Sequence, residues 1–174
     1  AIDSPPDSDL NVCGPFESYP DKIWDKIIDV NIKGVYLSCK IFGNAMVQKG
    51  FGNIININSI YGMVSPDQSI YDYKRKDGNE FYKPAAYSVS KSAILNFTRY
   101  LAVYWAKNNI RVNSIVFAGV ENQQDQDFKK AYCKRIPIGR MANVNEYNGT
   151  LLYLASKASS YMTGSTIVVD GGWT

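Results

Sequence analysis

Histidine is absent from this sequence of 174 residues, and only three cysteines are present. A Ser-His-Asp triad needs an imidazole base, and zinc sites use imidazole or closely spaced thiolate ligands. The cysteines, Cys13, Cys39 and Cys133, lie far apart and form neither a metal signature nor a disulfide framework. We therefore expect no metal site and no histidine-dependent hydrolase.

Long apolar runs and strong charge patches are lacking as well. No apolar run approaches the ~20 residues that span a bilayer, and residues 1–9 are too acidic and polar for a signal peptide. The net charge is +3, and the short basic run 74–76 stands among acidic residues. These features predict a cytoplasmic protein with no membrane and no nucleic-acid partner.

The composition is that of an ordinary globular domain, with 45% hydrophobic and 20% charged residues. No internal repeat or linker divides the chain, so residues 1–174 are expected to form a single domain. Helical and strand patterns alternate, which indicates an α/β fold with a parallel sheet. The patterns predict helices over residues 20–49, 84–108 and 146–156, and strands over residues 53–58, 110–117 and 166–170. Between residues 59 and 83 we expect a long loop, and loops of that length are more often functional than idle.

A tyrosine four residues before a lysine occurs three times, at Tyr36/Lys40, Tyr87/Lys91 and Tyr153/Lys157. On a helix, this spacing puts both side chains on nearly one face, about one turn apart. A neighbouring ammonium group stabilises the phenolate and lowers a pKa that starts near ~10, which suits proton exchange with a substrate hydroxyl. Most such pairs lie only on helix surfaces, so their context must decide between them.

The context favours Tyr87. It lies in the first turn of its predicted helix, directly after the long loop, where an active site on a parallel sheet is expected. The same loop begins at Ser59, just beyond the carboxyl end of a predicted buried strand, where a hydroxyl can bond the reacting oxygen. Tyr36 and Tyr153 lie within amphipathic helices and have no such partner.

Several segments together resemble the core of the classical short-chain dehydrogenases: Ile-Ile-Asn-Ile-Asn-Ser at 54–59, Tyr-Ser-Val-Ser-Lys-Ser-Ala at 87–93, Ile-Arg-Val-Asn-Ser-Ile at 110–115, Asp-Val-Asn-Ile-Lys-Gly at 29–34 and the ending at 161–172. They cover nearly the whole chain in the family's order. The resemblance implies a Rossmann-type doubly wound parallel sheet in three layers, present as its carboxyl-terminal portion with the first βαβ units absent.

The resemblance also assigns catalytic roles. Tyr87 is the acid/base, and Ser59 orients and polarises the substrate oxygen. Lys91 lowers the pKa of the tyrosine and holds the nicotinamide ribose hydroxyls, and Asn31 supports a water that relays protons to Lys91. Two plainer alternatives stay open: Asn31 as a helix-kink residue bonded to backbone, and Ser59 as a strand-end cap.

The implied cofactor is NAD or NADP, bound by Asn31, Tyr87, Lys91, Gly119 and the main chain of Val120. The family's glycine-rich turn, which holds the pyrophosphate, does not occur among the 13 glycines. We therefore expect that these residues alone neither bind the cofactor tightly nor turn over substrate, and the choice between NAD and NADP is not readable here.

The stretch between Ser59 and Tyr87 is longer than in most family members. With residues 120–123, it resembles the branch associated with flagellin modification and bacterial sugar biosynthesis. Ser59, Tyr61 and Asn122 are the expected substrate-binding residues, since hydroxyls, aromatic faces and amides suit a polyhydroxylated small molecule. Equally, the tyrosines of this stretch could only pack the loop onto the body.

The sequence thus predicts an NAD(P)-dependent oxidoreductase that interconverts a secondary alcohol and a ketone, acting as a homodimer or homotetramer through the helix bearing Tyr87. Two alternatives stay open: a nucleotide-sugar epimerase or dehydratase of the extended branch, and a non-catalytic dimerisation fragment. The early ending at Trp173 and Thr174 disfavours the extended branch, which adds a substrate domain.

Overall fold

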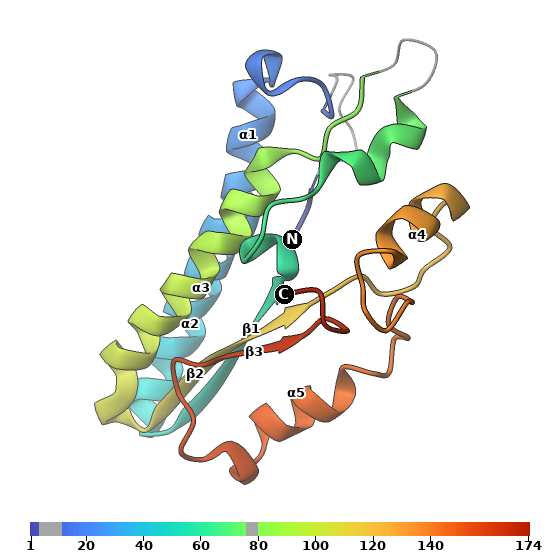
Figure 1. Ribbon diagram of the computed structural model, residues 1–174. Helices are drawn as coiled ribbons and strands as arrows, with labels where there is room; N and C mark the ends of the chain where they lie inside the picture. Colours follow the sequence, from blue (N-terminus) through green and yellow to red (C-terminus); the bar gives the residue numbers. More distant parts are fainter. Residues whose placement is uncertain (4–11, 76–79) are drawn as a thin grey trace.

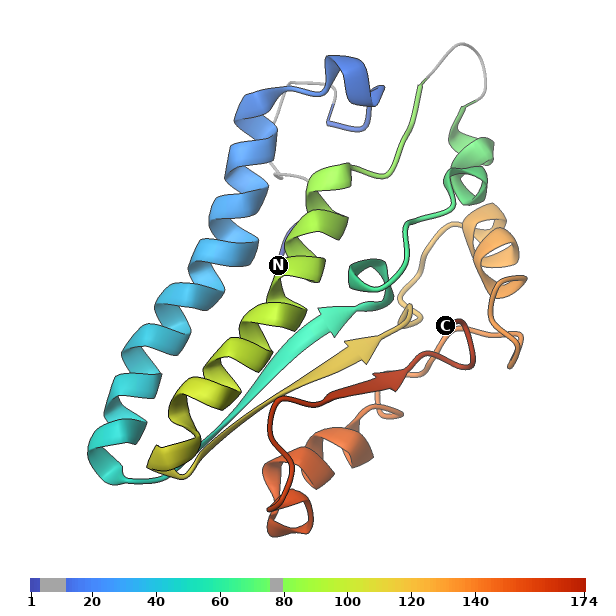
Figure 2. The same cartoon turned by 60° about the vertical axis from the view of Figure 1, so that its left-hand side comes forward.

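The computed structural model describes residues 1–3, 12–75 and 80–174. Three parallel strands form a sheet in the order β1-β2-β3. Their bounds are Gly52–Ser59 for β1, Ile110–Phe117 for β2 and Thr166–Val169 for β3. Helices α2 (Gly34–Lys49) and α3 (Ala85–Trp105) pack against one face, and α5 (Asn148–Ala155) packs against the other (Figures 1 and 2). The expected three-layer α/β architecture is confirmed.

The helix predicted over residues 20–49 is interrupted in its middle. Helix α1 (Asp21–Ile28) passes through a π-helical segment, η2 (Asp29–Lys33), into α2 without a break in direction (Figure 2). Gly50 ends α2 in the left-handed conformation with φ of 75°, which glycine adopts without a steric penalty. Segments of π-helix occur frequently at functional sites, and this one contains Asn31.

The central strand β2 is buried along nearly its whole length, because α3 and α5 cover its two faces. One core cluster joins α2, α3 and β2 through Cys39, Leu101, Trp105 and Val112. Gly43 in α2 lies directly against the Trp105 ring, so α2 and α3 approach closely there. The apolar run that predicted a buried strand therefore corresponds to the centre of the sheet.

The stretch predicted as a long loop has more regular structure than expected. It contains two 3₁₀ helices, η3 (Ile60–Gly62) and η4 (Gln68–Lys74). Their Ile60, Tyr61, Ile70 and Tyr71 side chains are buried in a second core cluster, which α4 (Gln126–Cys133) completes. The aromatic residues were read from the sequence as loop residues, but burying them holds this segment on the body.

The remaining elements are short. They are the 3₁₀ helices η1 (Phe16–Ser18), η5 (Ala106–Asn108) and η6 (Lys157–Ser159), and η5 extends α3 to the predicted end at Asn108. No helix in the described residues is long and apolar enough to cross a membrane. All three strands end at the same edge of the sheet, where Ser59 pairs with Phe117 and Phe117 with Val169. This carboxyl edge is where ligands bind in open parallel sheets.

Candidate active site

Tyr87 and Ser59 face each other at the carboxyl edge of the sheet. Tyr87 is the third residue of α3, and Ser59 is the last residue of β1. The two hydroxyls lie close enough for Ser59 to lower the pKa of the Tyr87 hydroxyl. The Ser59 hydroxyl also accepts a hydrogen bond from the Tyr61 backbone N–H at 3.2 Å, so the serine caps η3 as well as contacting the tyrosine. The predicted pairing across a shared cleft is present.

Lys91 lies one helical turn beyond Tyr87 on the same face of α3. Its ammonium nitrogen is 5.8 Å from the centre of the Tyr87 ring and donates to the Ile57 carbonyl at 3.2 Å. The residue is only 8% exposed. The lysine therefore reaches under the tyrosine toward β1, which is the arrangement that its spacing predicted.

Burial dominates the electrostatics of the pair. It raises the pKa of the Tyr87 hydroxyl above its ordinary value, and the hydrogen bond with Ser59 lowers it again in part. Burial also lowers the pKa of Lys91. In this state the low polarity around Tyr87 outweighs the expected effect of the neighbouring ammonium group, so the phenol keeps its proton at neutral pH.

Asn31 is buried in η2 and ties three segments together. Both of its amide hydrogens are donated, to the Ile2 carbonyl at 2.7 Å and to the Ser90 hydroxyl at 3.0 Å. Its side-chain oxygen accepts from the Ile2 backbone N–H at 2.7 Å. These contacts are those of a helix-kink residue bonded to backbone, which is the plainer of the two readings of Asn31.

Two further residues of the site were not predicted from the sequence. Asn58 accepts a hydrogen bond from the Ser59 backbone at 2.9 Å and donates to the Lys91 carbonyl at 3.0 Å. A Cβ on Gly62 would lie 2.9 Å from the carbonyl carbon of Lys91, so η3 rests directly on the backbone of α3. The signal for Asn58 was an asparagine in a strand that was expected to be buried, since a buried amide needs partners.

A cleft of about 440 Å³ opens above Ser59 and Tyr87. Gly119 and Val120, in the turn after β2, and the aromatic ring of Tyr61 belong to its wall. Gln124 also lines it, whereas the Asn122 side chain is exposed and does not. The structure thus brings five of the predicted residues to one cleft, and Gln124 rather than Asn122 contributes a side-chain amide to its lining.

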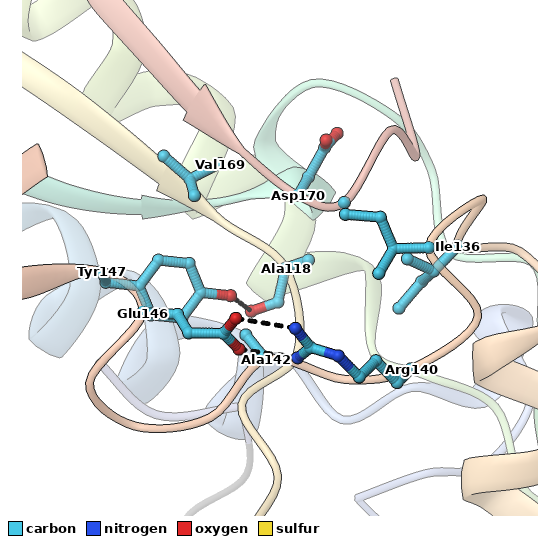
Figure 3. A pocket seen from close by; sticks show the side chains of 10 residues that line it. Ala118, Ile136, Arg140, Ala142, Glu146, Tyr147, Val169 and Asp170 are labelled. Carbon is cyan, nitrogen blue, oxygen red and sulfur yellow. Dashed lines mark hydrogen bonds and ion pairs between the residues drawn. The ribbon is translucent and has the colours of Figure 1, made fainter. Parts of the chain in front are cut away.

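The turn after β2 is held from both sides. The Gly119 N–H donates to the Tyr132 hydroxyl at 2.8 Å, and the Gln124 side-chain amide donates to the Val120 carbonyl at 2.7 Å. On the far side, the Tyr147 hydroxyl donates to the Ala118 carbonyl at 3.2 Å. Figure 3 shows this contact above a small pocket, where Arg140 and Glu146 form a two-point ion pair. The turn is therefore positioned before any ligand binds.

The residues fit a nicotinamide cofactor in part. Lys91 and Asn31 also line a second cavity of about 740 Å³, which runs along β1 and α2. Lys91 borders this second cavity and not the cleft, whereas Tyr87 lines the cleft. The main chain of Val120 would meet the nicotinamide carboxamide, and its carbonyl accepts a hydrogen bond from the side-chain amide of Gln124.

Lys83 and Asp3 are charged residues of the cleft that the sequence did not single out. Lys83 lies four residues before Tyr87, ahead of the start of α3, with its ammonium nitrogen 5.2 Å from the centre of the Tyr87 ring. It forms an ion pair with Asp3, and both residues line the cleft. The two residues are 80 positions apart in the sequence, so no local pattern indicated the pair.

The other two tyrosine–lysine pairs lie elsewhere. Tyr36 is 45% exposed on α2, where Lys40 lies over its ring at 5.8 Å, and Tyr153 is 42% exposed on α5. Neither tyrosine lines the cleft. The arrangement defines a Rossmann-type α/β protein with a single tyrosine–serine–lysine constellation among the described residues at the carboxyl edge of its sheet.

Known proteins are similar to this chain in both sequence and fold. The sequence model described as Enoyl-(Acyl carrier protein) reductase matches residues 8–174. The chain is 37% identical over 162 residues to 2-dehydro-3-deoxy-D-gluconate 5-dehydrogenase of Dickeya dadantii, covering 89% of this chain and 58% of that protein. It is 33% identical over 170 residues to NAD-dependent glycerol dehydrogenase of Listeria innocua, covering 91% and 58%.

A solved short-chain dehydrogenase from Leptospira borgpetersenii with bound NAD⁺ has a TM-score of 0.84 and 34% identity, covering 96% of this chain and 62% of that one. The chain therefore belongs to the short-chain dehydrogenase/reductase family. It spans 58% of the length of the two curated relatives.

Proposed function

We propose that the complete protein is an NAD(P)-dependent oxidoreductase that interconverts a secondary alcohol and a ketone on a sugar-like small molecule. The observation that carries this proposal is the contact of the Ser59 and Tyr87 hydroxyls, with Lys91 one turn away at the same edge of the sheet. The named activities of the two relatives, a dehydrogenase of a sugar acid and one of glycerol, support it.

In ketone reduction, Tyr87 donates its phenolic proton to the developing alkoxide, and Ser59 donates a hydrogen bond to the same oxygen. In alcohol oxidation, Tyr87 accepts the proton in its phenolate form. The cofactor supplies or takes up the hydride. Because both hydroxyls converge on one point of the cleft, the reacting oxygen is held while the proton moves.

Lys91 has two tasks in this proposal: it stabilises the phenolate of Tyr87, and it binds the ribose hydroxyls of the cofactor. Asn31 fixes the segment that begins at Ala1 against α3, and its oxygen atoms hold a water that exchanges protons with Lys91. Gly119 and Val120 present main-chain groups to the nicotinamide. Tyr61 contacts the substrate, and Gln124, which lines the cleft, supplies the amide group expected of Asn122.

The cofactor is NAD or NADP in this proposal, and the glycine-rich turn that would bind its pyrophosphate lies outside these residues. Exposed apolar side chains on α2 and α3, among them Tyr36, Tyr100 and Val103, support a homodimer or homotetramer formed through these helices. A cytoplasmic location and a role in sugar biosynthesis, such as flagellin modification, belong to the same proposal.

The direct test is an assay of the complete protein with NAD⁺ or NADP⁺ and a panel of polyols and sugar acids, followed by the absorbance of the reduced cofactor. We expect reduction of one cofactor with at least one secondary alcohol of the panel, and loss of that activity in Ser59→Ala. Cofactor binding without any alcohol-dependent reduction, across the whole panel and both cofactors, would contradict the proposal.

A further inference from the structure

The Asp3–Lys83 ion pair lies inside the candidate substrate cleft. Lys83 comes from the segment that leads into α3, and Asp3 comes from the amino-terminal segment that Asn31 holds in place. Both line the same cleft as Ser59, Tyr61 and Tyr87. The pair therefore contributes to the chemistry that a substrate meets, although it lies outside the catalytic constellation.

The two charges are held close to the reacting group. The Lys83 side chain is 16% exposed and the Asp3 side chain 48% exposed. The ammonium group lies over the Tyr87 ring, and the carboxylate is near enough to raise the pKa of the Tyr87 hydroxyl. Burying an ammonium group without compensation is costly, and the Asp3 carboxylate compensates the charge of Lys83 from within the chain.

This pairing has a consequence for charged substrates. Among the described residues that line the cleft, Asp3 is the only Asp or Glu and Lys83 the only Lys or Arg, and the two side chains form an ion pair. A substrate carboxylate placed beside Lys83 would lie beside the Asp3 carboxylate too, and like charges in such proximity are strongly unfavourable. An uncharged polyol meets no such repulsion, and its hydroxyls can donate to the half-exposed carboxylate of Asp3.

The other groups of the cleft also suit hydroxyls. Tyr61, Tyr71, Tyr132 and Gln124 line it with phenol and amide groups. The Tyr71 hydroxyl lies close enough to affect the pKa of Tyr61, yet the buried Tyr61 hydroxyl makes no hydrogen bond of normal geometry to the described residues. Because Tyr61 lines the cleft and an unpaired buried hydroxyl is costly, this group is suited to bind a substrate oxygen.

We propose that the Asp3–Lys83 pair makes this cleft selective for uncharged polyols and ketoses over sugar acids, with Asp3 accepting hydrogen bonds from substrate hydroxyls and Lys83 holding Asp3 in place. This inference rests on the proposed oxidoreductase function and decides between the two substrate classes that its relatives represent, a sugar acid and a neutral polyol.

The test compares matched substrates on the complete protein: D-glucitol, D-mannitol and galactitol against D-gluconate, D-mannonate and D-galactonate. The best hexitol should exceed its matched aldonate at least about tenfold in kcat/KM, as expected for juxtaposed like charges. Calorimetric affinities of the same six compounds give the same comparison without turnover. Failure of every compound to react contradicts the proposed function, whereas turnover or binding that favours the aldonates overturns this inference alone.

Two variants test the pair itself. Asp3→Asn removes the repelling charge and leaves Lys83 as a single cation, so the preference for hexitol over aldonate should fall about tenfold or reverse. Lys83→Met removes the cation and leaves Asp3 negative, so aldonates should react still more slowly relative to hexitols. Asp25→Asn, which removes the same charge from an exposed position on α1, is the matched control and should leave the ratio unchanged.

A purely structural role of the pair would weaken hexitols and aldonates alike. An unchanged ratio in both Asp3→Asn and Lys83→Met would therefore overturn the inference, even if both variants were less stable. Opposite shifts of the ratio in the two variants would support it.

Discussion

At the scale of single residues, Tyr87 is subject to two opposing effects. Burial raises the pKa of its hydroxyl above the ordinary value of 10.0, and the hydrogen bond with Ser59 lowers it. The net direction is upward, so the protonated phenol dominates through the neutral range. This state is ready to act as an acid in ketone reduction, whereas alcohol oxidation needs the phenolate.

The raised pKa predicts different pH profiles for the two directions of the reaction. The kcat/KM for alcohol oxidation should rise about tenfold per pH unit below the pKa of Tyr87, because only the phenolate accepts the proton. The kcat/KM for ketone reduction should stay flat and fall only above that pKa. In Ser59→Ala the residual rise should move to higher pH, since the hydrogen bond that lowers the pKa is lost. A profile for oxidation that falls between pH 8 and about 10 would contradict this assignment.

Lys91→Met should damage turnover and cofactor affinity together. One ammonium group serves both the phenolate and the ribose, so we expect kcat to fall by about 10²-fold or more and the dissociation constant for NAD(P)H to rise. Steady-state kinetics and a fluorescence titration measure the two effects separately. Lys157→Met changes the lysine of the exposed third pair and should leave both quantities unaltered. If turnover fell while cofactor affinity stayed unchanged, Lys91 would not bind the ribose of the cofactor.

The sequence predicted those site residues whose positions follow from spacing along the chain. Tyr87 and Lys91 are four positions apart on one helix, and Ser59 follows a recognisable buried strand. Asp3 and Lys83 were missed because their contact joins distant segments, and the partners of Asn58 became visible only once β1 was placed beside α3. No periodic pattern reports such contacts.

At the scale of elements, the packing of η3 on α3 positions the site. Gly62 allows the closest approach, since a Cβ there would lie 2.9 Å from both the Asn58 side-chain oxygen and the Lys91 carbonyl carbon. Any side chain at this position pushes η3, and with it Ser59, away from Tyr87. The element contact is therefore part of the catalytic geometry.

Gly62→Ala should lower both stability and activity. We expect about 1–3 kcal/mol of destabilisation, as for other insertions into close-packed contacts, measured by denaturant unfolding, and a lower kcat from the displaced serine. Gly149→Ala is the matched control, because nothing lies within 4 Å of a Cβ at this exposed position in α5. It should be neutral or stabilising, since alanine favours a helix over glycine. If the two variants had the same stability and the same kcat, the contact at Gly62 would not be tightly packed.

The helices and strands were predicted well where the segment with a periodic pattern is long, and poorly where that segment is short. The strands and α3 lie close to their expected bounds. The π-helical turn at 29–33 leaves the apolar spacing nearly intact and gave no signal, and the 3₁₀ helices η3 and η4 were read as loop because their residues show neither helical nor strand periodicity.

At the scale of the whole molecule, the sheet is open along β1. In the described part of the chain, β1 pairs only with β2, and the larger cavity follows its other side. The longer relatives have residues beyond the matched part of their chains, since the match covers 58% of the two curated ones. The family fold predicted from the motifs is thus confirmed for its carboxyl-terminal portion, which contains the site.

The most direct test of the central claim is the turnover of Tyr87→Phe in the complete protein, compared with Tyr36→Phe and Tyr153→Phe. Removing the Tyr87 hydroxyl should lower kcat by at least about 10²-fold, the usual effect of losing a general acid/base. The two control variants should keep near-normal turnover, because their tyrosines lie outside the cleft. Near-normal activity of Tyr87→Phe, together with loss of activity in either control, would contradict the account.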